Sequence, residues 1–480
     1  DDQSIYKFRG ATIENILSFE KQFPGAMVIR LEQNYRSTKK ILDAANHVIA
    51  NNTERKGKNL WTGNEDGEKI VVQRLQDERG EAAFIVETVE DHVAKGARYS
   101  DHAVLYRMNA QSGELEKALV KAGVPYKIIG GLRFFDRKEI KDIIAYLSVI
   151  DNPNDAVRLG RILNEPKRGI GDATAAALAE ISGVTGVPVM EVMATADSYE
   201  KLQRKSGVLG DFAHMMEMLS HLAAEEPLEI LFDAVLEQTG YSDMLAAQGF
   251  EGQTRLENLE ELRSTIIKFS EENPEGTLAE FLEEVALYTD LDRTDLEEDS
   301  VILMTMHSAK GLEYPYVFIA GCEEGIFPGR MSMGSPAEIE EERRLAYVAI
   351  TRAKKQLYIT TAAQRMIFGQ TVWNKPSRFV GEIPKELMEY TDTTAQRRQA
   401  ALHVRETPQN VVRAGGMSAV SAAPSAGAEI RAGDTVSHRL FGTGLVLSAT
   451  PMAGDVLVEI AFDKVGTKKL MANFAKLKKI

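Results

Sequence analysis

The sequence predicts an α/β protein in which a parallel sheet domain is interrupted by an all-helical insertion and followed by a small β-barrel. Apolar runs typical of strands alternate with amphipathic runs typical of helices before and after the middle of the chain. Between about residues 134 and 294 the strand-like runs vanish and only helical periodicity remains. After residue 430, short β runs separated by glycines suggest a barrel.

The first part of the chain opens with the helix-like ATIENILSFEKQF and continues with MVIRLEQNYRSTKKILDAANHVIANN. This second stretch predicts a strand, a polar loop and a helix with Ser37 as its N-cap. The elements expected next are strand KIVVQRL, helix EAAFIVETVEDHVAKG, strand HAVLYRM, helix GELEKALVKAG and strand YKIIGG. Beyond the helical insertion, VILMTMHSAKGLEYPYVFIAGC and KKQLYITTA resume the strand and loop pattern, so one sheet domain is built from two separated segments.

Length and composition narrow the function classes. A chain of 480 residues predicts two to four domains, and 44% hydrophobic with 27% charged residues is ordinary for a globular protein. One cysteine, Cys322, cannot form an internal disulfide, so we expect the cytoplasm, and no apolar run is long enough to predict a membrane span. The net charge of -14 argues only weakly against a nucleic-acid partner, because DNA binding depends on a local basic track.

Two arginines in separate loops suggest a nucleotide-binding site. LEQNYRST places Tyr35 and Arg36 in a loop at the edge of the sheet where α/β folds bind ligands, and EEERRLAYVAITRAKK places Arg352 between a helix and a strand. Guanidinium groups suit a γ-phosphate, and an exposed aromatic ring suits a base. The alternative, that each arginine forms a surface salt bridge, remains open.

The loop within VILMTMHSAKGLEYPYVFIAG is a second candidate for phosphate chemistry. Its glycine and small polar side chains would allow a phosphate chain to approach the backbone. A purely structural role for the histidine is the alternative. The residues concerned are Thr305, His307, Ser308, Lys310, Gly311 and Glu313.

Four stretches in order carry a family resemblance: DDQSIYKFRGA, LEQNYRST, TMHSAKGLEYPYVF and EEERRLAYVAITRAKK. They resemble motifs III to VI of superfamily 1A DNA helicases of the UvrD/Rep/PcrA family, with the Gram-positive members as the nearest pattern. The similarity covers essentially the whole chain, including GGLRFFDRKEIKD before the insertion.

The resemblance implies RecA-like folding of the P-loop NTPase type and a set of site residues. Catalytic roles fall to Gln3, Arg36 and Arg352, and ATP-binding roles to Tyr35 on adenine, Glu313 on ribose and Gly311. DNA-binding roles fall to Tyr6, Phe8, Arg9, Asn109, Thr305 and His307 on single-stranded DNA and to Lys167, Arg168, Gly169 and Gly171 on duplex DNA. For the last group, a plain helix-turn-helix connection is the alternative.

The resemblance also implies the domain order. We expect a remnant of a first RecA-like domain at 1–26, a second RecA-like domain at 27–133 and 295–390, and the helical insertion at 134–294. A flexible linker rich in Ala, Ser and Gly follows at 391–429, then a Tudor-like barrel at 430–480. The resemblance implies that the barrel binds another protein, RNA polymerase being the expected partner. Its lysines could instead contact nucleic acid.

Neither G-x-x-x-x-G-K-[ST] nor an acidic Walker B segment occurs in the chain, so we expect both, with the Mg²⁺ ligands, upstream of Asp1. No metal ligand is assigned within the chain. The expected function is the C-terminal portion of an ATP-dependent 3′-5′ DNA helicase of repair or replication, acting on single-stranded DNA and strand junctions, with this chain alone inactive. Two alternatives are a non-catalytic DNA- or RNA-polymerase-binding protein and a helicase-nuclease, although no nuclease cluster follows the barrel. Departures from the family are Lys7, Phe8 and Gly113.

Overall fold

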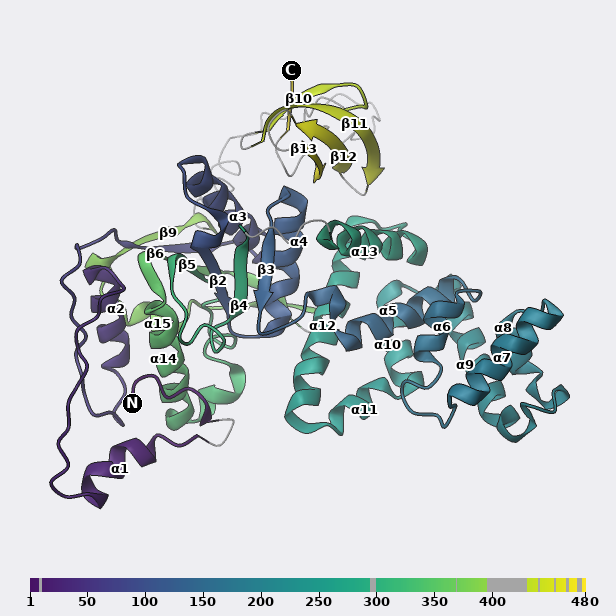
Figure 1. Cartoon of the computed structure of the whole chain (residues 1–480), viewed down its shortest axis with the longest axis horizontal. Coiled ribbons are helices and arrows are strands. Elements are labelled where there is room, and N and C mark those ends of the chain that lie inside the picture. Colours follow the sequence, from purple (N-terminus) through teal and green to yellow (C-terminus); the bar gives the residue numbers. More distant parts are fainter. Residues whose placement is uncertain are drawn as a thin grey trace, which may run out of the picture. The chain divides into compact units, whose positions relative to one another are not determined.

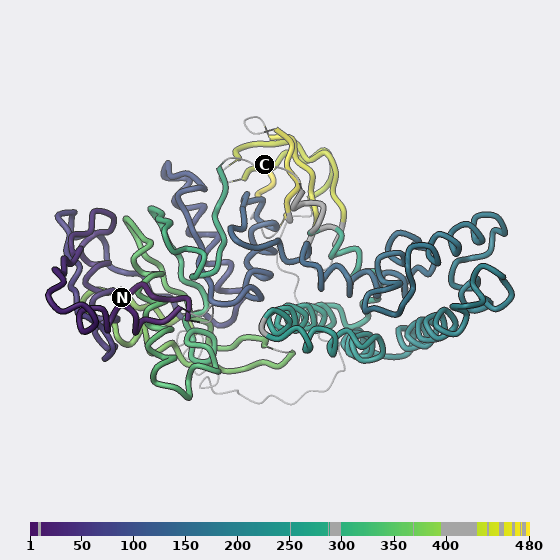
Figure 2. The backbone as a smooth tube through the Cα atoms, turned by 60° about the horizontal axis from the view of Figure 1, so that its bottom comes forward, coloured from purple at the N-terminus to yellow at the C-terminus, as the bar shows by residue number. Residues whose placement is uncertain are grey.

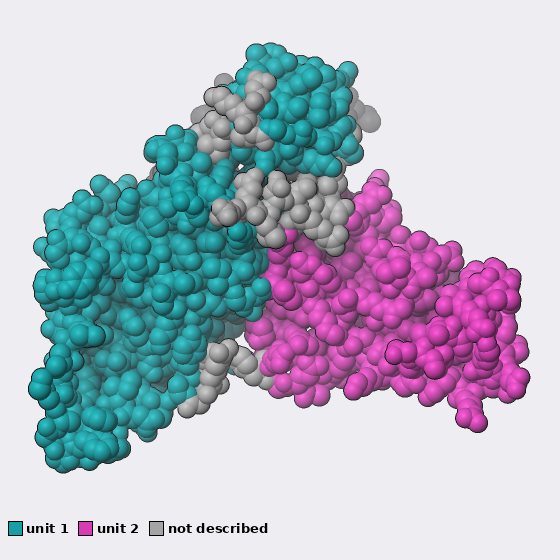
Figure 3. All heavy atoms as spheres, viewed as in Figure 1, with its two compact units in different colours: residues 1–131, 295–365, 372–480 teal, residues 132–294, 366–371 magenta. Residues whose placement is uncertain are grey.

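A computed structural model describes the chain over most of its length. The described residues are 1–7, 11–293, 299–367, 369–394, 430–438, 441–452, 455–462, 466–472 and 477–480. Phe8, Arg9 and most of the expected linker lie outside them. The chain divides into two compact units, shown in Figure 3: unit 1 comprises residues 1–131, 295–365 and 372–480, and unit 2 comprises residues 132–294 and 366–371.

A seven-stranded sheet in which all pairs are parallel forms the centre of unit 1 (Figure 1). Its strand order is β3-β4-β2-β5-β6-β1-β9. The strands from both segments of the chain therefore interleave, which confirms the predicted interrupted α/β fold. Their bounds are β1 Ile70–Leu75, β2 His102–Tyr106, β3 Tyr126–Ile129, β4 Val301–Thr305, β5 Tyr314–Ile319, β6 Ala353–Ala362 and β9 Met388–Asp392.

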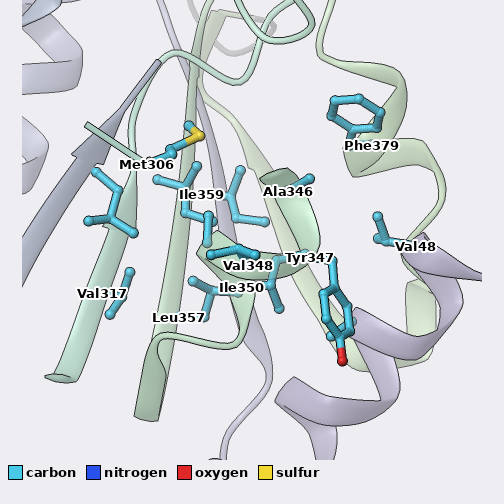
Figure 4. Packing of buried hydrophobic residues seen from close by; sticks show 14 of the residues in the cluster. Val48, Met306, Val317, Ala346, Tyr347, Val348, Ile350, Leu357, Ile359 and Phe379 are labelled. Carbon is cyan, nitrogen blue, oxygen red and sulfur yellow. The ribbon is translucent and has the colours of Figure 1, made fainter. Parts of the chain in front are cut away.

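The helices of unit 1 other than α1 pack around this sheet and its core. The helices are α1 Glu14–Gln22, α2 Lys39–Ile49, α3 Glu78–Ala94, α4 Ser112–Ala122, α14 Pro336–Ile350 and α15 Arg378–Gly381. Helix α2 packs on α14, and α3 packs on α4. Figure 4 shows Val48 of α2, Val348 of α14 and Leu357 of β6 among the side chains that fill this core. The central strands read as continuous apolar runs because both sheet faces are covered.

Two local predictions for residues 27–38 were wrong. Residues 27–32 form no strand, and the side chains of Met27, Ile29 and Leu31 are mostly exposed. An apolar run becomes a strand only where a neighbouring strand can pair with it, and here only Gln33 forms an isolated bridge. The N-cap of α2 is Thr38 rather than Ser37, because the Ser37 hydroxyl donates instead to the Ala353 carbonyl at 2.6 Å.

The first seven residues pack against the rest of unit 1 (Figure 2). Ile5 is fully buried in the sheet core, and the carboxylate of Asp2 accepts two hydrogen bonds from the Arg55 guanidinium at 3.1 and 2.9 Å. Arg344 of α14 donates to the Ser4 carbonyl at 3.2 Å. Helix α1, by contrast, buries none of its residues.

Unit 2 is helical, as predicted for the insertion. Its helices are α5 Lys138–Asp151, α6 Ala156–Ile162, α7 Asp172–Thr185, α8 Val189–Ala194, α9 Ser206–Glu225, α10 Leu228–Thr239, α11 Tyr241–Ala246, α12 Gly249–Glu272 and α13 Leu278–Arg293. Near its centre the buried carboxylate of Asp142 binds Lys138, Arg161 and the Tyr241 hydroxyl at 2.6 to 2.8 Å. Among the described helices of both units, none is long and apolar enough to cross a membrane.

A five-stranded antiparallel sheet forms the C-terminal part, in the order β13-β12-β11-β10-β14. The strands are β10 Thr435–His438, β11 Gly442–Met452, β12 Asp455–Phe462, β13 Gly466–Met471 and β14 Lys478–Lys479. It has a hydrophobic core of its own, which includes Val436, Val458 and Ile460. The separate antiparallel strand domain confirms the predicted small β module. A short hairpin, β7 Gln364–Ile367 and β8 Gln370–Trp373, lies outside both sheets.

A chain of hydrogen bonds beneath α3 contains two neutral histidines. His102 can only donate from Nδ1 to the Arg98 carbonyl at 2.9 Å, so its Nε2 accepts from His92 Nδ1 at 3.0 Å. His92 Nε2 then accepts from the Tyr358 hydroxyl at 3.0 Å. Burial, reinforced by the neighbouring His102, lowers the pKa of His92 from 6.5 to about 4, and burial also lowers the pKa of His102.

We expect the free energy of unfolding to fall as the pH drops from about 6.5 toward about 4. The unfolded chain binds the proton more tightly than the folded one in this window, so acid favours unfolding, by on the order of 2 kcal/mol for His92. Urea unfolding at several pH values checks this. His92→Gln should flatten the pH slope, whereas His47→Gln, at an exposed position on α2, should keep it; equal slopes in all three proteins would contradict the assignment.

Candidate nucleotide site

The two candidate arginines and the candidate glutamate meet at the amino ends of two neighbouring strands. Glu313 directly precedes β5 and Arg352 directly precedes β6, and the Tyr314 N–H donates to the Arg352 carbonyl at 3.0 Å. The sequence had placed Tyr35 and Arg36 at the ligand-binding edge of an α/β sheet, which is the carboxyl edge. That placement was wrong for Arg36, which meets Glu313 at the amino end of β5, whereas Arg352 lies between a helix and a strand as predicted.

Arg36 reaches this site from the loop before α2. The loop is held by Asn34, whose side-chain oxygen accepts the N–H groups of Arg36 and Ser37 at 2.8 and 3.0 Å. It is also fastened to β6, because the Thr38 N–H donates to the Lys354 carbonyl at 3.1 Å. Arg36 then donates from Nε to the Glu313 carboxylate and from Nη1 to the Thr351 carbonyl at 3.3 Å.

The guanidinium of Arg352 is buried. Among the described residues, no carboxylate is hydrogen-bonded to it. Its guanidinium donates to the Val348 carbonyl at 2.9 Å, the Leu312 carbonyl at 3.1 Å and the Thr351 hydroxyl at 3.0 Å. Burial and then the positive charge of Arg36 lower its pKa to about 10, so it remains cationic at neutral pH. A buried cation bound only to neutral oxygens fits an anion as a further partner.

Glu313 accepts from two cations, one of which the sequence analysis missed. Lys354 Nζ lies 2.8 Å from Oε1, and Arg36 Nε donates to Oε2. The hydrogen bond from Lys354, followed by the one from Arg36, lowers the pKa of Glu313 to about 2. Arg36 and Lys354 thus contact one carboxylate, and with the nearby charge of Arg352 the cluster is positive. In the sequence, the one sign that Lys354 belongs to the site is its position two residues after Arg352.

Three other predicted nucleotide residues lie in nearby loops. The Tyr35 side chain is 78% exposed, and its hydroxyl donates to the Gln33 side-chain oxygen at 2.8 Å. The Gln3 carbonyl accepts from Lys310 Nζ at 2.9 Å, which joins the N-terminal segment to the loop between β4 and β5. Gly311 in that loop has φ +91°, a conformation that favours glycine.

The loop of residues 306–312 connects the two edges of the sheet. Thr305 is the last residue of β4, at its carboxyl end, whereas Glu313 stands at the amino end of β5. His307 lies in this loop, and its carbonyl accepts from the Tyr6 hydroxyl at 3.2 Å. Lys310 Nζ lies 5.2 Å from the Tyr6 ring centroid. Asn109 follows β2, the strand paired with β4, so the structure places it at the same carboxyl edge as Thr305.

In unit 2, side-chain hydrogen bonds hold the loop before α7, which presents its residues differently than expected. The Asn164 side-chain oxygen accepts the N–H groups of Arg168 and Ile170 at 2.8 and 3.2 Å. The Arg168 guanidinium turns inward, where it donates to the Tyr146 hydroxyl at 2.6 Å and the Ile162 carbonyl at 3.0 Å. The neighbouring positions remain exposed: Lys167, Gly169 with φ +74° and Gly171, the N-cap of α7.

A groove of 710 Å³ between α5, α6 and α13 lies entirely within unit 2. Its walls are largely apolar, and Arg158, Arg161 and Lys141 at its rim are each paired with an aspartate. The groove therefore has no evident anion chemistry. Among the described residues, no group of three His, Cys, Asp or Glu side chains could hold a metal ion.

Three family models match the chain in succession. Residues 29–364 match the UvrD-like helicase C-terminal domain, residues 432–479 match the PcrA/UvrD tudor domain, and residues 1–24 match the UvrD/REP helicase N-terminal domain. Among solved structures, the C-terminal domain of a possible DNA helicase from Lactobacillus plantarum aligns over 74% of this chain and 98% of its own, with a TM-score of 0.30 at 10% identity, which supports no inference.

Curated relatives resemble the whole chain. The ATP-dependent DNA helicase PcrA of Bacillus subtilis is 43% identical over 490 residues, and that of Staphylococcus epidermidis is 44% identical over 486 residues. Each match covers 100% of this chain but 66% and 65% of the relative, so the chain spans about two thirds of the length of these proteins. Since the first family model alone covers more than half of the residues, the chain belongs to the UvrD-like helicase C-terminal domain family.

Proposed function

We propose that this chain is part of an ATP-dependent DNA helicase that moves 3′ to 5′ along single-stranded DNA and unwinds duplexes in repair or replication. The observation that carries the proposal is the positive cluster at the amino ends of β5 and β6, where Arg36 pairs with Glu313 and the buried Arg352 donates only to neutral oxygens among the described residues. Two converging guanidinium groups are suited to stabilise the charge that develops on a transferred phosphoryl group.

Within this proposal each residue near the cluster has a role. Arg36 and Arg352 bind the γ-phosphate, Glu313 holds the ribose, and the exposed ring of Tyr35 stacks on the base. Gln3 helps to place the attacking water. ATP supplies the phosphoryl group, and the Mg²⁺ that accompanies it takes its ligands from the Walker segments that this sequence does not contain.

DNA contacts are proposed for the carboxyl edge of the same sheet. Tyr6 stacks on a base, and Thr305, His307 and Asn109 line the strand path. The short loop 306–312 supports coupling between the two sites, because it joins His307 directly to Glu313, so that a change at either site is passed along one short segment. Phe8 and Arg9 remain proposed DNA contacts from the sequence alone.

The domain assignments follow the same proposal. Residues 1–26 belong to a first RecA-like domain, a role that fits the exposed apolar side chains of Ile16, Phe19 and Phe23 on and after α1. The barrel binds RNA polymerase, and the protein works in the cytoplasm, as its lone, buried Cys322 suggests.

We expect Lys167 and Arg168 of unit 2 to have different roles, one in binding duplex DNA and the other in stabilising the fold. We expect Lys167→Ala to weaken duplex binding severalfold with unchanged stability, because Lys167 is exposed and can reach a phosphate. Arg168→Ala should instead destabilise the protein by about 2 kcal/mol, because it empties a hydrogen-bonded site. Fluorescence anisotropy and urea unfolding check both. A stable Arg168→Ala protein with weak DNA binding would contradict this assignment, because Arg168 would then bind DNA rather than stabilise the fold.

Strand displacement tests the proposed function. In a chimera, the segment of the Bacillus subtilis relative that this chain does not cover is joined to Asp1, and unwinding of 3′-tailed and 5′-tailed duplexes is measured with ATP. The expected result is unwinding of the 3′-tailed duplex only, with loss of activity in Arg36→Ala. Tight DNA binding with no ATP-dependent unwinding would instead support the alternative of a non-catalytic binding protein.

A further inference from the structure

Glu313 is shared between two cations, and the proposed function requires only one of them to move. Arg36 Nε donates to one carboxylate oxygen, and Lys354 Nζ lies 2.8 Å from the other. Under the proposed function the guanidinium of Arg36 turns toward a phosphate, so nucleotide binding separates it from Glu313. That separation removes a charge-assisted hydrogen bond from the Glu313 carboxylate.

We propose that Lys354 is a positioning residue that holds Glu313 in place while Arg36 is engaged with a nucleotide's phosphate. The inference rests on the proposed function. Lys354 is well placed for this task, because it is the second residue of β6 and its carbonyl accepts the Thr38 N–H at 3.1 Å. Its backbone is thus tied to the start of α2, next to the loop that carries Arg36, and its Nζ already contacts the Glu313 oxygen that Arg36 leaves free.

In this proposal Arg36 exchanges Glu313 for a phosphate when a nucleotide binds, and Glu313 keeps Lys354 as its partner. Without nucleotide, Glu313 neutralises Arg36 and competes with any anion for it. With nucleotide, Glu313 stays on Lys354 and accepts from the sugar hydroxyls, which a bare polyphosphate cannot offer. If Lys354 is removed, the release of Arg36 leaves Glu313 without a described cationic partner, so anion binding becomes weaker. If Glu313 is neutralised, Arg36 is released from its competitor, so anion binding becomes tighter.

The test is a titration of the 480-residue chain with inorganic tripolyphosphate. The Nε–H resonance of Arg36, identified by its absence in Arg36→Lys, reports binding by NMR on ¹⁵N-arginine-labelled protein. Lys354→Gln is compared with Lys355→Gln, which removes the same charge from the exposed next residue. We expect Lys354→Gln to raise the Kd about threefold, the scale of a partly exposed ion pair, and Lys355→Gln and Lys354→Arg to leave it unchanged.

A double-mutant cycle with Glu313→Gln shows whether Lys354 acts through Glu313. We expect Glu313→Gln alone to lower the Kd, and Lys354→Gln to have no further effect in that background. A full effect of Lys354→Gln in the Glu313→Gln background would overturn the inference, because Lys354 would then bind the anion itself. Equal effects of Lys354→Gln and Lys355→Gln would also overturn it. If tripolyphosphate does not shift the Arg36 resonance of the unaltered chain, the phosphate role of Arg36 is wrong, and the inference falls with the proposed function.

Discussion

Replacing Arg352 with lysine in the ATP-hydrolysing chimera is expected to lower kcat about a thousandfold with a much smaller change in the KM for ATP. An arginine that stabilises the transferred phosphoryl group contributes on this scale, because its charge acts most strongly in the transition state. Lysine keeps the positive charge but cannot reproduce the guanidinium hydrogen bonds to Val348, Leu312 and Thr351 that aim it. Steady-state ATP hydrolysis with saturating single-stranded DNA measures both constants.

Controls separate this effect from a folding defect. Arg30→Lys changes an exposed arginine that bonds only the Gly57 carbonyl among the described residues, so kcat should stay at the starting value. The melting temperature of Arg352→Lys should stay within a few degrees of the unaltered protein. A stable Arg352→Lys protein with unchanged kcat would show that the buried guanidinium is structural, and the proposed phosphate role would be wrong.

Replacing Arg365 with leucine is expected to destabilise the protein by about 3 to 5 kcal/mol. Arg365 is buried between two buried carboxylates, with its Nη2 2.6 Å from Glu81 and 2.7 Å from Glu323. The same two carboxylates also accept from Thr360, Asn374 and two backbone N–H groups, so they cannot turn toward water. Removing the cation leaves two like charges buried and uncompensated.

The matched control is Arg378→Leu, which breaks the more exposed pair between Arg378 and Glu324 at 2.6 Å. An exposed pair contributes at most about 1 kcal/mol, so the two variants should differ severalfold in their effect. Urea unfolding followed by circular dichroism measures both. Similar small losses in the two variants would mean that the Arg365 cluster adds little to the stability of unit 1.

Much of the fold was predictable because local pattern and tertiary environment agree. Apart from the edge strand β9, Met388–Asp392, which was not predicted, the strands of the parallel sheet after residue 69 contain apolar runs, since both sheet faces are covered, and the helical insertion lacks strand-like runs. The failure at residues 27–32 has the opposite cause. MVIRLE has the composition of a strand, but its side chains are exposed and no strand pairs with it. Composition alone cannot supply a pairing partner.

The candidate site was only partly predictable for a similar reason. The sequence identified Arg36, Glu313 and Arg352, but the edge of the sheet at which they meet depends on the chain direction through β5 and β6. Lys354 was missed because its partner lies far away along the chain. Arg168 was expected to face DNA, and only the contacts with Asn164 and Tyr146 show that it stabilises its own loop.

ATP hydrolysis in the presence of single-stranded DNA tests most directly whether this chain carries one half of a nucleotide site. The rate is measured for the 480-residue chain alone and for the chimera that adds the uncovered segment of the Bacillus subtilis relative. We predict no measurable hydrolysis by the chain alone and DNA-stimulated hydrolysis by the chimera that Arg36→Ala abolishes. Hydrolysis by the isolated chain, or hydrolysis by the chimera that survives the loss of Arg36, would contradict the assignment of the Arg36, Glu313 and Arg352 cluster.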